Sequence, residues 1–271
     1  MTTREILQIA MEQSAIDLCA EAKDFEKTEN VVVLSGESER ARRYLRLPFS
    51  CQLVSYGSNV VASVSPEFRE ITEAYVNRYP VEHLFETPNL HVLNDALMER
   101  GQRICFMAEY FLPDVDALQA RAVEDVGPYE MRILTPQDFA SLYRPEWSNA
   151  LCEQRKHLDV LGVGAYDGDT LIGLAGASAD CDTMWQIGID VLPAYRRRGI
   201  ASALTSRLAA EILARGKVPF YCAAWSNIKS VRNAIRSGFR PAWVEMTAKP
   251  KEMVDEMNGI TPKGAPNHDH P

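Results

Sequence analysis

Between residues 160 and 215 the chain alternates short apolar segments with tight polar turns and ends in one amphipathic helix. Asp167-Gly168-Asp169 is typical of a hairpin turn and Asp180-Cys181-Asp182 of a second turn, which predicts strands at 160–166, 170–177 and 184–191. Gly216 is well placed to end the helix predicted over 199–215. One face of this helix is an apolar stripe of Ile200, Leu204, Leu208 and Ile212.

The flanking segments extend this pattern into two predicted domains, which a chain of 271 residues can accommodate. Upstream, we expect a helix over 2–22, a strand at 31–34 and a hairpin at 51–64. Two helices at 66–78 and 91–100, a strand at 104–110 and a helix at 114–125 follow. The first helix is amphipathic and gathers Ile6, Ala10 and Met11 on one face. We place a boundary at Val126-Gly127-Pro128 and expect a smaller N-terminal α+β domain at 1–127.

Beyond the boundary, a strand at 129–134 precedes a helix with Pro136 in its first position and Thr135 as its cap. After Gly216 we expect a strand, a helix and a strand at 218–224, 227–237 and 238–247. The whole chain is therefore predicted to be an α+β or α/β protein, with a second domain at 128–249. A polar, proline-containing tail at 250–271 is expected to be disordered.

Charge and cysteine pattern narrow the class of protein. A formal net charge of −8 argues against general nucleic-acid binding, because such a chain repels phosphate backbones. Acidic residues interrupt the N-terminus where a signal peptide needs apolar ones, and no segment has the length of a membrane span. The six cysteines form no Cys-x-x-Cys pair, so we expect free thiols, a cytoplasmic location and no metal. His268-Asp269-His270 in the tail favours a solvated surface over a metal site.

The segment from Asp190 to Ala201 predicts a phosphate site. A strand leads into a tight turn and a helix begins, where backbone N–H groups lack internal partners and the helix dipole is positive. Gly199 and Ala201 are small enough for a phosphate to approach the backbone, and Arg196, Arg197 and Arg198 add positive potential. Three arginines alone would favour an ordinary basic turn. The order of strand, glycine, small residue and helix favours the phosphate instead, although no Walker loop is present.

These residues resemble the signature of the GCN5-related N-acetyltransferases, the GNAT superfamily. In that signature Gln or Arg is followed three residues later by Gly, and Gly or Ala stands two residues after that glycine. Arg196, Gly199 and Ala201 match it, and Asn227, Ser230 and Ser237-Gly238-Phe239 resemble the second motif. The stretches 187–190 and 225–227 also resemble a bacterial subgroup with an extra N-terminal domain. Over about 129–247 the resemblance implies a mixed, mostly antiparallel sheet flanked by helices.

The resemblance also implies how acetyl-CoA is held. The loop amides, from Arg196 through Ile200 to Ala201, would bind its pyrophosphate, while Asn227 and Ser230 would contact the pantetheine arm or the nearby phosphates. The oxyanion donor would be a backbone N–H in the stretch from Ile189 to Val191. A bulge there would separate this strand from 218–224 and admit the pantetheine.

The catalytic side chains do not follow from the resemblance. The tyrosine that many relatives carry corresponds to Ala234, and a glutamate used by others corresponds to Trp185-Gln186. A base is nevertheless expected, because deprotonating a lysine-like amine at pH 7 costs about 4–5 kcal/mol.

Three residues are candidates for the catalytic roles, each with a structural alternative. Asp190 is the candidate base, and its alternative is to form hydrogen bonds with the backbone at the bulge. Tyr221 is the candidate acid, and its alternative is a packed aromatic. Ser226 is a proton relay or a helix cap, and Glu245 and His157 are further candidates.

The sequence therefore predicts an N-acetyltransferase that moves an acetyl group from acetyl-CoA to a primary amine, with a small molecule as the preferred acceptor. A non-catalytic CoA-binding regulatory module stays open because the two catalytic groups are missing. Acetylation of a protein or peptide amine also stays open, as does the formation of a homodimer. We expect no nucleic-acid and no membrane partner.

Overall fold

The computed structural model describes residues 1–121 and 127–260, and the chain divides into two compact units. Unit 1 comprises Met1–Asp17, Ser38–Arg46 and Ala108–Val244; unit 2 comprises Leu18–Glu37, Leu47–Met107 and Glu245–Pro271. The units are interleaved along the chain, whereas we expected two consecutive domains. The predicted boundary includes Val126, which lies outside the described residues, and it stays a prediction.

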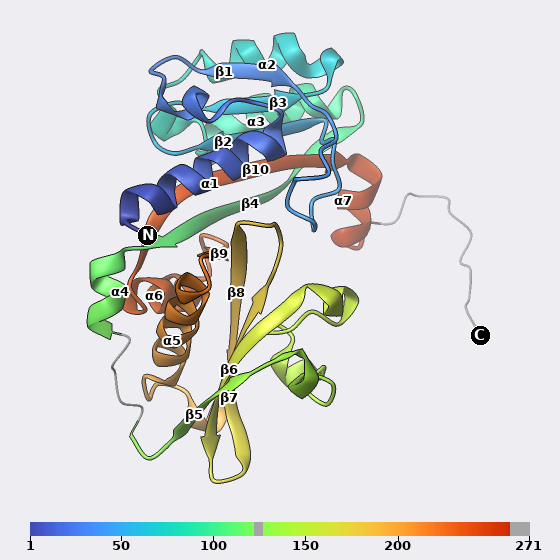
Figure 1. Ribbon diagram of the computed structural model, residues 1–271. Coiled ribbons are helices and arrows are strands. Elements are labelled where there is room, and N and C mark those ends of the chain that lie inside the picture. The colour runs from blue at the N-terminus through green and yellow to red at the C-terminus, as the bar shows by residue number, and fades with distance from the viewer. Residues whose placement is uncertain (122–126, 261–271) are drawn as a thin grey trace, which may run out of the picture. The chain divides into compact units, whose positions relative to one another are not determined.

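Unit 1 contains a mixed, mostly antiparallel sheet, as expected (Figure 1). Four strands pair antiparallel in chain order: β5 (Glu130–Leu134), β6 (Asp159–Asp167), β7 (Thr170–Ser178) and β8 (Met184–Val191). β9 (Val218–Ala223) then pairs with β8 in parallel. The other neighbour of β9 is β4 (Gln102–Pro113), which pairs with it antiparallel and precedes the boundary that we predicted.

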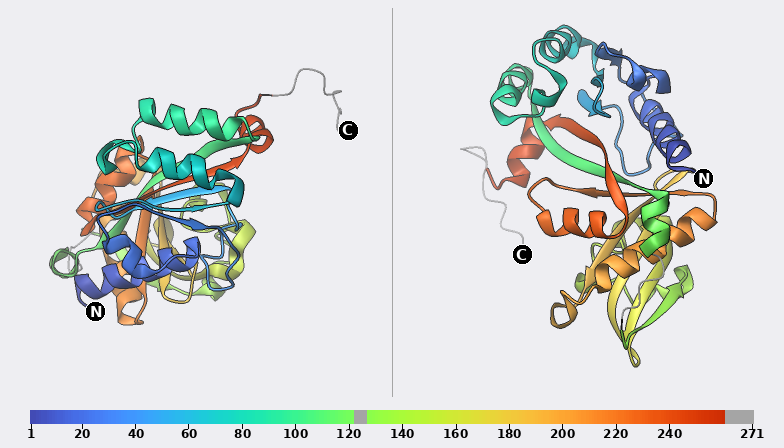
Figure 2. Two further views of the ribbon diagram at one scale, coloured as in Figure 1. Left: turned by 90° about the horizontal axis from the view of Figure 1, so that it is seen from above. Right: turned by 90° about the vertical axis from the view of Figure 1, so that its left-hand side faces the viewer.

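Helix α5 (Ile200–Ala214) packs against β6, β7 and β8 (Figure 2). The predicted stripe is buried against the sheet, which is the reason that the helix lies along it: Ile200, Leu204, Leu208 and Ile212 are at most 1% exposed. The other helices that belong wholly or mainly to this unit are α1 (Thr3–Leu18), α4 (Val115–Arg121) and α6 (Ile228–Arg236). The helix predicted from Pro136 is a single 3-10 turn, Pro136–Asp138, with Thr135 and Asp138 forming a capping box.

Unit 2 is built around β1 (Val31–Leu34), β2 (Cys51–Ser55) and β3 (Val61–Val64). β3 lies between the other two, parallel to β1 and antiparallel to β2. Helix α2 (Arg69–Val76) packs against β1, β3 and α3 (Thr87–Met98). Among the described residues, no helix combines the length and the apolar character of a membrane span.

The end of the chain differs from the expected tail. Strand β10 (Phe239–Pro250) divides between the units at Val244, and Lys251–Met257 forms helix α7 in unit 2. The local reason is polar: the Asp255 carboxylate accepts from Lys251 four residues earlier and from Arg103 at 2.5 Å. Residues 261–271 lie outside the described part of the chain.

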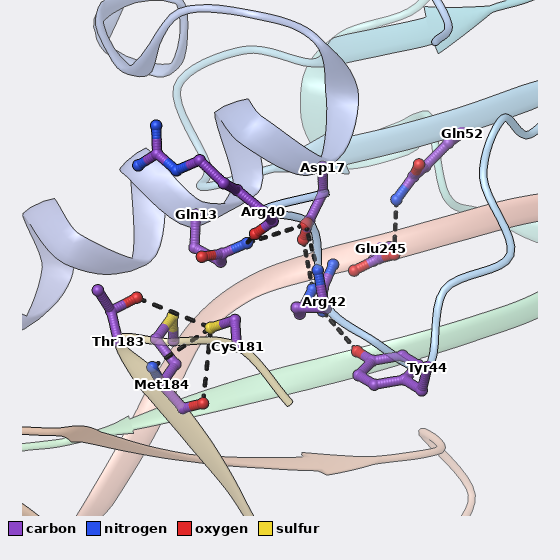
Figure 3. A network of polar contacts seen from close by, with 10 residues as sticks. All are labelled: Gln13, Asp17, Arg40, Arg42, Tyr44, Gln52, Cys181, Thr183, Met184 and Glu245. Atoms are coloured by element: carbon purple, nitrogen blue, oxygen red, sulfur yellow. Dashed lines mark hydrogen bonds and ion pairs between the residues drawn. The ribbon is translucent and has the colours of Figure 1, made fainter. Parts of the chain in front are cut away.

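A buried polar network lies inside unit 1 (Figure 3). The Asp17 carboxylate is 1% exposed and accepts from the backbone N–H of Arg42 at 2.9 Å and from its Nε. Gln13 Nε2 donates to the same carboxylate at 3.0 Å, and Arg42 in turn donates to the Tyr44 hydroxyl. These bonds join α1 to the segment at 38–46, which explains how residues before the predicted boundary belong to unit 1.

Asp180, also in unit 1, is a buried acid with incomplete partners. Its Oδ1 accepts from Ser178 at 2.8 Å and lies 3.7 Å from the Arg155 guanidinium, while Oδ2 has no hydrogen-bond partner among the described residues. Burial raises its pKa from 3.8 to about 6; Ser178 and the two arginines Arg155 and Arg42 oppose the shift, and Asp159 adds to it.

A pH-dependent stability follows from this shift. The protonated acid is favoured in the folded state, so Asp180 adds stability below about pH 4, and this stability is lost as the pH rises through about 6. The shift of about two units corresponds to about 3 kcal/mol. Asn does not titrate, so the stability of Asp180→Asn minus that of the unmodified chain should increase by about that amount when the pH is raised from 4 to 7. Urea denaturation of both proteins at the two pH values measures it; a stability difference independent of pH would contradict it.

Candidate functional site

The loop between β8 and α5 has the geometry expected of an anion site. Pro193–Tyr195 forms a 3-10 turn, and α5 begins at Ile200 with Gly199 as its N-cap. Gly199 has φ +82°, a left-handed conformation that glycine adopts without strain, and an added Cβ would meet no atom within 4 Å. The backbone therefore turns sharply into the helix and leaves open space beside Gly199.

The N–H groups that follow this turn are unpaired. Within the described residues, none of the amides from Arg197 to Ser202 donates a backbone or side-chain hydrogen bond; the first that does is Ala203, which donates to Gly199 O at 3.1 Å. Such unpaired donors at the positive end of a fifteen-residue helix favour an anion.

The three arginines occupy different positions. Arg196 Nε donates to Val191 O at 2.9 Å, and Arg198 donates to the Tyr129 hydroxyl and to Ala194 O. Arg197 is exposed, has φ +63° and has no ion pair or hydrogen bond among the described residues. Two of the arginines thus stabilise the loop, and the third is free to contact a ligand.

Strands β8 and β9 separate beside this loop. Their parallel pairing covers only Met184↔Val218 to Gln186↔Phe220, although β8 continues to Val191 and β9 to Ala223. Beyond that point β9 is paired with β4, through Glu109↔Ala223, Tyr110↔Cys222 and Phe111↔Tyr221. The separation that we expected is therefore present. The bulge that we expected as its cause is not, because β8 keeps an unshifted register with β7 up to Gly173↔Val191.

The unpaired edge of β8 carries two amides. Hydrogen bonds alternate along an antiparallel strand, and Leu192 N donates to Ile172 O in the ladder with β7. The amides of Val191 and Ile189, one and three residues earlier, therefore point to the opposite edge, where β9 no longer pairs. Both residues were expected to contact the ligand from the sequence, and their N–H groups are the ones directed into the opening between β8 and β9.

Asp190, the candidate base, is engaged on the opposite face of the sheet. Its carboxylate accepts from the backbone N–H groups of Asn149 at 2.8 Å and Ala150 at 3.0 Å, and from the Asn149 side-chain amide at 2.7 Å. Below this segment lie the paired glycines Gly176 and Gly188, whose added Cβ atoms would come within 2.0 and 1.8 Å of its carbonyl oxygens. Asp190 therefore binds backbone, but that of the segment at 149–150 and not that of the bulge we expected in its own strand. It holds this segment against the two glycines of the sheet.

Tyr221, the candidate acid, packs between the sheet and the helices at 3% exposure. Its hydroxyl lies 2.7 Å from Ser230 Oγ on α6, and burial raises its pKa. Ser230 N donates to the Asn227 side chain, which caps α6. The cap is therefore Asn227, and the expectation that Ser226 caps this helix was wrong; Ser226 is exposed in the turn before it. The roles implied for Tyr221, Asn227 and Ser230 stay predictions.

The two further candidates belong to different units, His157 to unit 1 and Glu245 to unit 2. His157 is exposed in the 3-10 segment Glu153–Leu158. Glu245 is 4% exposed in unit 2 and accepts from Gln52 at 2.7 Å (Figure 3). Neither the exposed position of His157 nor the hydrogen bond of Glu245 indicates a catalytic role.

One carboxylate that was not among the predicted site residues lies one strand away from the opening, on the other side of β9. Glu109 is on β4, directly opposite Ala223, which lies at the end of β9 that is not paired with β8. It is half-buried, and no hydrogen bond or ion pair holds it among the described residues. Glu109 has this position because β4 pairs with β9, and the local sequence around Glu109 does not predict that pairing.

Comparison with known proteins identifies related sequences and folds. A family model described as GNAT acetyltransferase matches residues 83–242, more than half of the chain, and its range includes β4. No curated protein matches the chain.

Among solved structures, a GCN5-related N-acetyltransferase-like protein from Streptococcus suis is 20% identical, covers 60% of this chain and 69% of its own, and has a TM-score of 0.44. An acetyltransferase of the GNAT family from Colwellia psychrerythraea is 14% identical, with 76% and 84% covered and a TM-score of 0.44. A GCN5-related N-acetyltransferase from Sphaerobacter thermophilus is 15% identical, with 70% and 72% covered and a TM-score of 0.45.

Proposed function

Because this chain belongs to the GNAT acetyltransferase family, we propose that it transfers the acetyl group of acetyl-CoA to a primary amine, with a small molecule as acceptor. The observation that carries the proposal is the pairing of two features in one place: the unpaired amides at the start of α5 and the separation of β8 from β9 beside them. The family acts by transfer from CoA in general; the amine and its small size are our proposal.

The residues present suit CoA. The amides from Arg197 to Ser202 are assigned to its diphosphate, with the exposed Arg197 side chain as an additional cation. The amides of Ile189 and Val191 are assigned to the pantetheine arm and the acyl oxygen, because both N–H groups point into the opening. Bound acetyl-CoA supplies an acyl group activated as a thioester.

The chain's own contribution is then positioning and charge stabilisation. A fixed N–H donor at Ile189 or Val191 stabilises an oxygen that gains negative charge, without reorganising during the reaction. Holding the reacting carbon next to the amine removes translational and rotational entropy from the barrier. Asn227 and Ser230 stay assigned to the ligand by resemblance. Asn227 Oδ1 already caps α6 and Ser230 Oγ already contacts the Tyr221 hydroxyl, so other hydrogen-bonding capacity of these side chains would serve the ligand.

Two alternatives make different predictions. A regulatory CoA-binding module would bind CoA and release no thiol in response to any amine; the alanine at position 234 favours this alternative. An enzyme that acts on protein or peptide amines would respond to peptides and not to small amines. The donor amides required for both binding and transfer favour an enzyme over a regulatory module, and the acceptor panel distinguishes small amines from peptides.

The test is a transfer assay. The purified chain is incubated with acetyl-CoA and a panel of small primary amines, and separately with peptides carrying free α-amino or lysine groups. We expect release of CoA thiol in equal amount to an N-acetylated small amine, identified by mass spectrometry. Thiol release with peptides alone supports the second alternative. CoA binding without amine-dependent release in either panel contradicts the proposed enzyme.

A further inference from the structure

Glu109 lies at the level of the free β8 amides. Extending the β8–β9 register from Gln186↔Phe220 by three residues brings Ile189 level with Ala223, and Ala223 is paired with Glu109. Neighbouring strands in a sheet are about 4.8 Å apart, so a glutamate side chain on β4 is long enough to extend over β9 toward the opening. Ala223, the residue it must pass, has only a methyl group.

The orientation of Glu109 follows from alternation along β4. Phe111, two residues later and so on the same face, packs edge-on against Tyr221 with ring centroids 6.4 Å apart. Glu109 therefore shares the face of Phe111 and Tyr221, which is also the face covered by α5 and carrying Ile189. The carboxylate and the edge of β8 lie on one side of the sheet.

The charge of Glu109 is not compensated. Burial raises the pKa of this carboxyl, and no charged group of the described chain contributes to the shift. On that face β9 carries one titratable side chain, Tyr221, whose hydroxyl lies 2.7 Å from Ser230 Oγ. A half-buried carboxylate without a partner is costly, and such groups gather at functional sites. A carboxylate whose pKa lies closer to neutrality is also a more effective base at neutral pH.

We propose that Glu109 is the catalytic residue that accepts a proton from the attacking amine, directly or through one water. This inference rests on the proposed function. Starting from an ammonium group, one proton moves to the Glu109 carboxylate while nitrogen forms a bond to the acyl carbon. The carbon–sulfur bond breaks, and the second nitrogen proton ends on the CoA sulfur. The products are an amide, the CoA thiol and one proton on Glu109, which passes to solvent.

The test compares Glu109→Gln with the unmodified chain. We expect kcat/KM to fall about 10²- to 10⁴-fold, the usual contribution of a general base. The loss of rate at low pH that the unmodified enzyme shows should disappear in the variant. The dissociation constant of CoA, measured by calorimetry, should stay within about twofold, which also reports that the variant is folded. Glu130→Gln, an exposed glutamate on β5 paired with Arg132, serves as the matched control and should change none of these values.

A second measurement does not depend on turnover. Carbon-13 NMR of side-chain carboxyls in the free chain should contain one glutamate signal that titrates above the ordinary value of about 4.3 and is absent in Glu109→Gln. An unchanged kcat/KM in the variant, or a Glu109 carboxyl that titrates at or below the ordinary value, overturns the inference while acetyl transfer by the unmodified chain stands. Absence of transfer by the unmodified chain overturns the proposed function and this role together.

Discussion

Replacing Gly188 with alanine is expected to lower the free energy of unfolding by about 3 kcal/mol or more, the largest stability effect that we predict for a single methyl group. The added Cβ would lie 1.8 Å from the carbonyl oxygen of Asn149, and that oxygen belongs to backbone that cannot rotate away. The segment is fixed from above by the three hydrogen bonds to Asp190, and Ala150 and Leu151 are buried beside it. Relieving the overlap requires those contacts to break.

Gly173→Ala, on the neighbouring strand β7, is the matched control. Its Cβ would meet the ends of the Leu204 and Ile200 side chains at 3.0 and 3.1 Å, which can shift by a few tenths of an ångström. Urea denaturation measures both variants, and the thermal midpoint of Gly188→Ala should fall by about 6–12 °C. If the two variants lose equal stability, the segment at 149–150 is not held against the sheet in the way described.

Replacing Gly199 with alanine is expected to weaken CoA binding at least tenfold. An L-residue at φ +82° costs about 1–2 kcal/mol, and the chain can relieve that strain by turning the peptides that follow. Those peptides carry the unpaired amides, so a small rotation misdirects several donors at once. We expect the loss to appear as a higher dissociation constant for CoA, with a decrease in fold stability of only about 1–2 kcal/mol.

The opposite end of the same helix provides the control. Gly216 follows α5, has φ +71°, and its added Cβ would likewise meet no atom within 4 Å. Gly216→Ala should therefore lose a similar amount of stability and keep its affinity for CoA. Calorimetric titration of both variants separates backbone strain from binding. Equal loss of affinity in the two variants would mean that the α5 N-terminus has no special role.

Local patterns in the sequence were sufficient to predict most elements of unit 1. The four-residue repeat of α5, the Asp-Gly-Asp turn and the glycine before Ile200 each act through neighbouring residues, and the structure has each of them where expected. The family resemblance, and not a local pattern, pointed to Ile189 and Val191, which lie at the end of the strand that leads into the loop.

What the sequence did not predict depends on which distant segments meet. β4 pairs with β9 across more than a hundred residues, and this pairing places Glu109 opposite Ala223, on the strand that borders the opening. The notch at Gly176 and Gly188 needs both the β7–β8 register and a third segment, 149–150, to be recognised. Asp190 was singled out for its position beside the amides, whereas its side chain points to the other face because successive residues of a strand alternate. The bulge was also expected wrongly: β9 stops pairing with β8 after Phe220 while β8 keeps an unshifted register with β7.

The central claim is that the unpaired amides at the start of α5 hold the diphosphate of CoA. Calorimetric titration of the unmodified chain with CoA and, separately, with pantetheine, which lacks the diphosphate, tests it most directly. We predict one CoA bound per chain, with an affinity that falls as salt is added, and pantetheine binding at least a hundredfold weaker. Equal binding of the two ligands, or no binding of CoA, would contradict the claim.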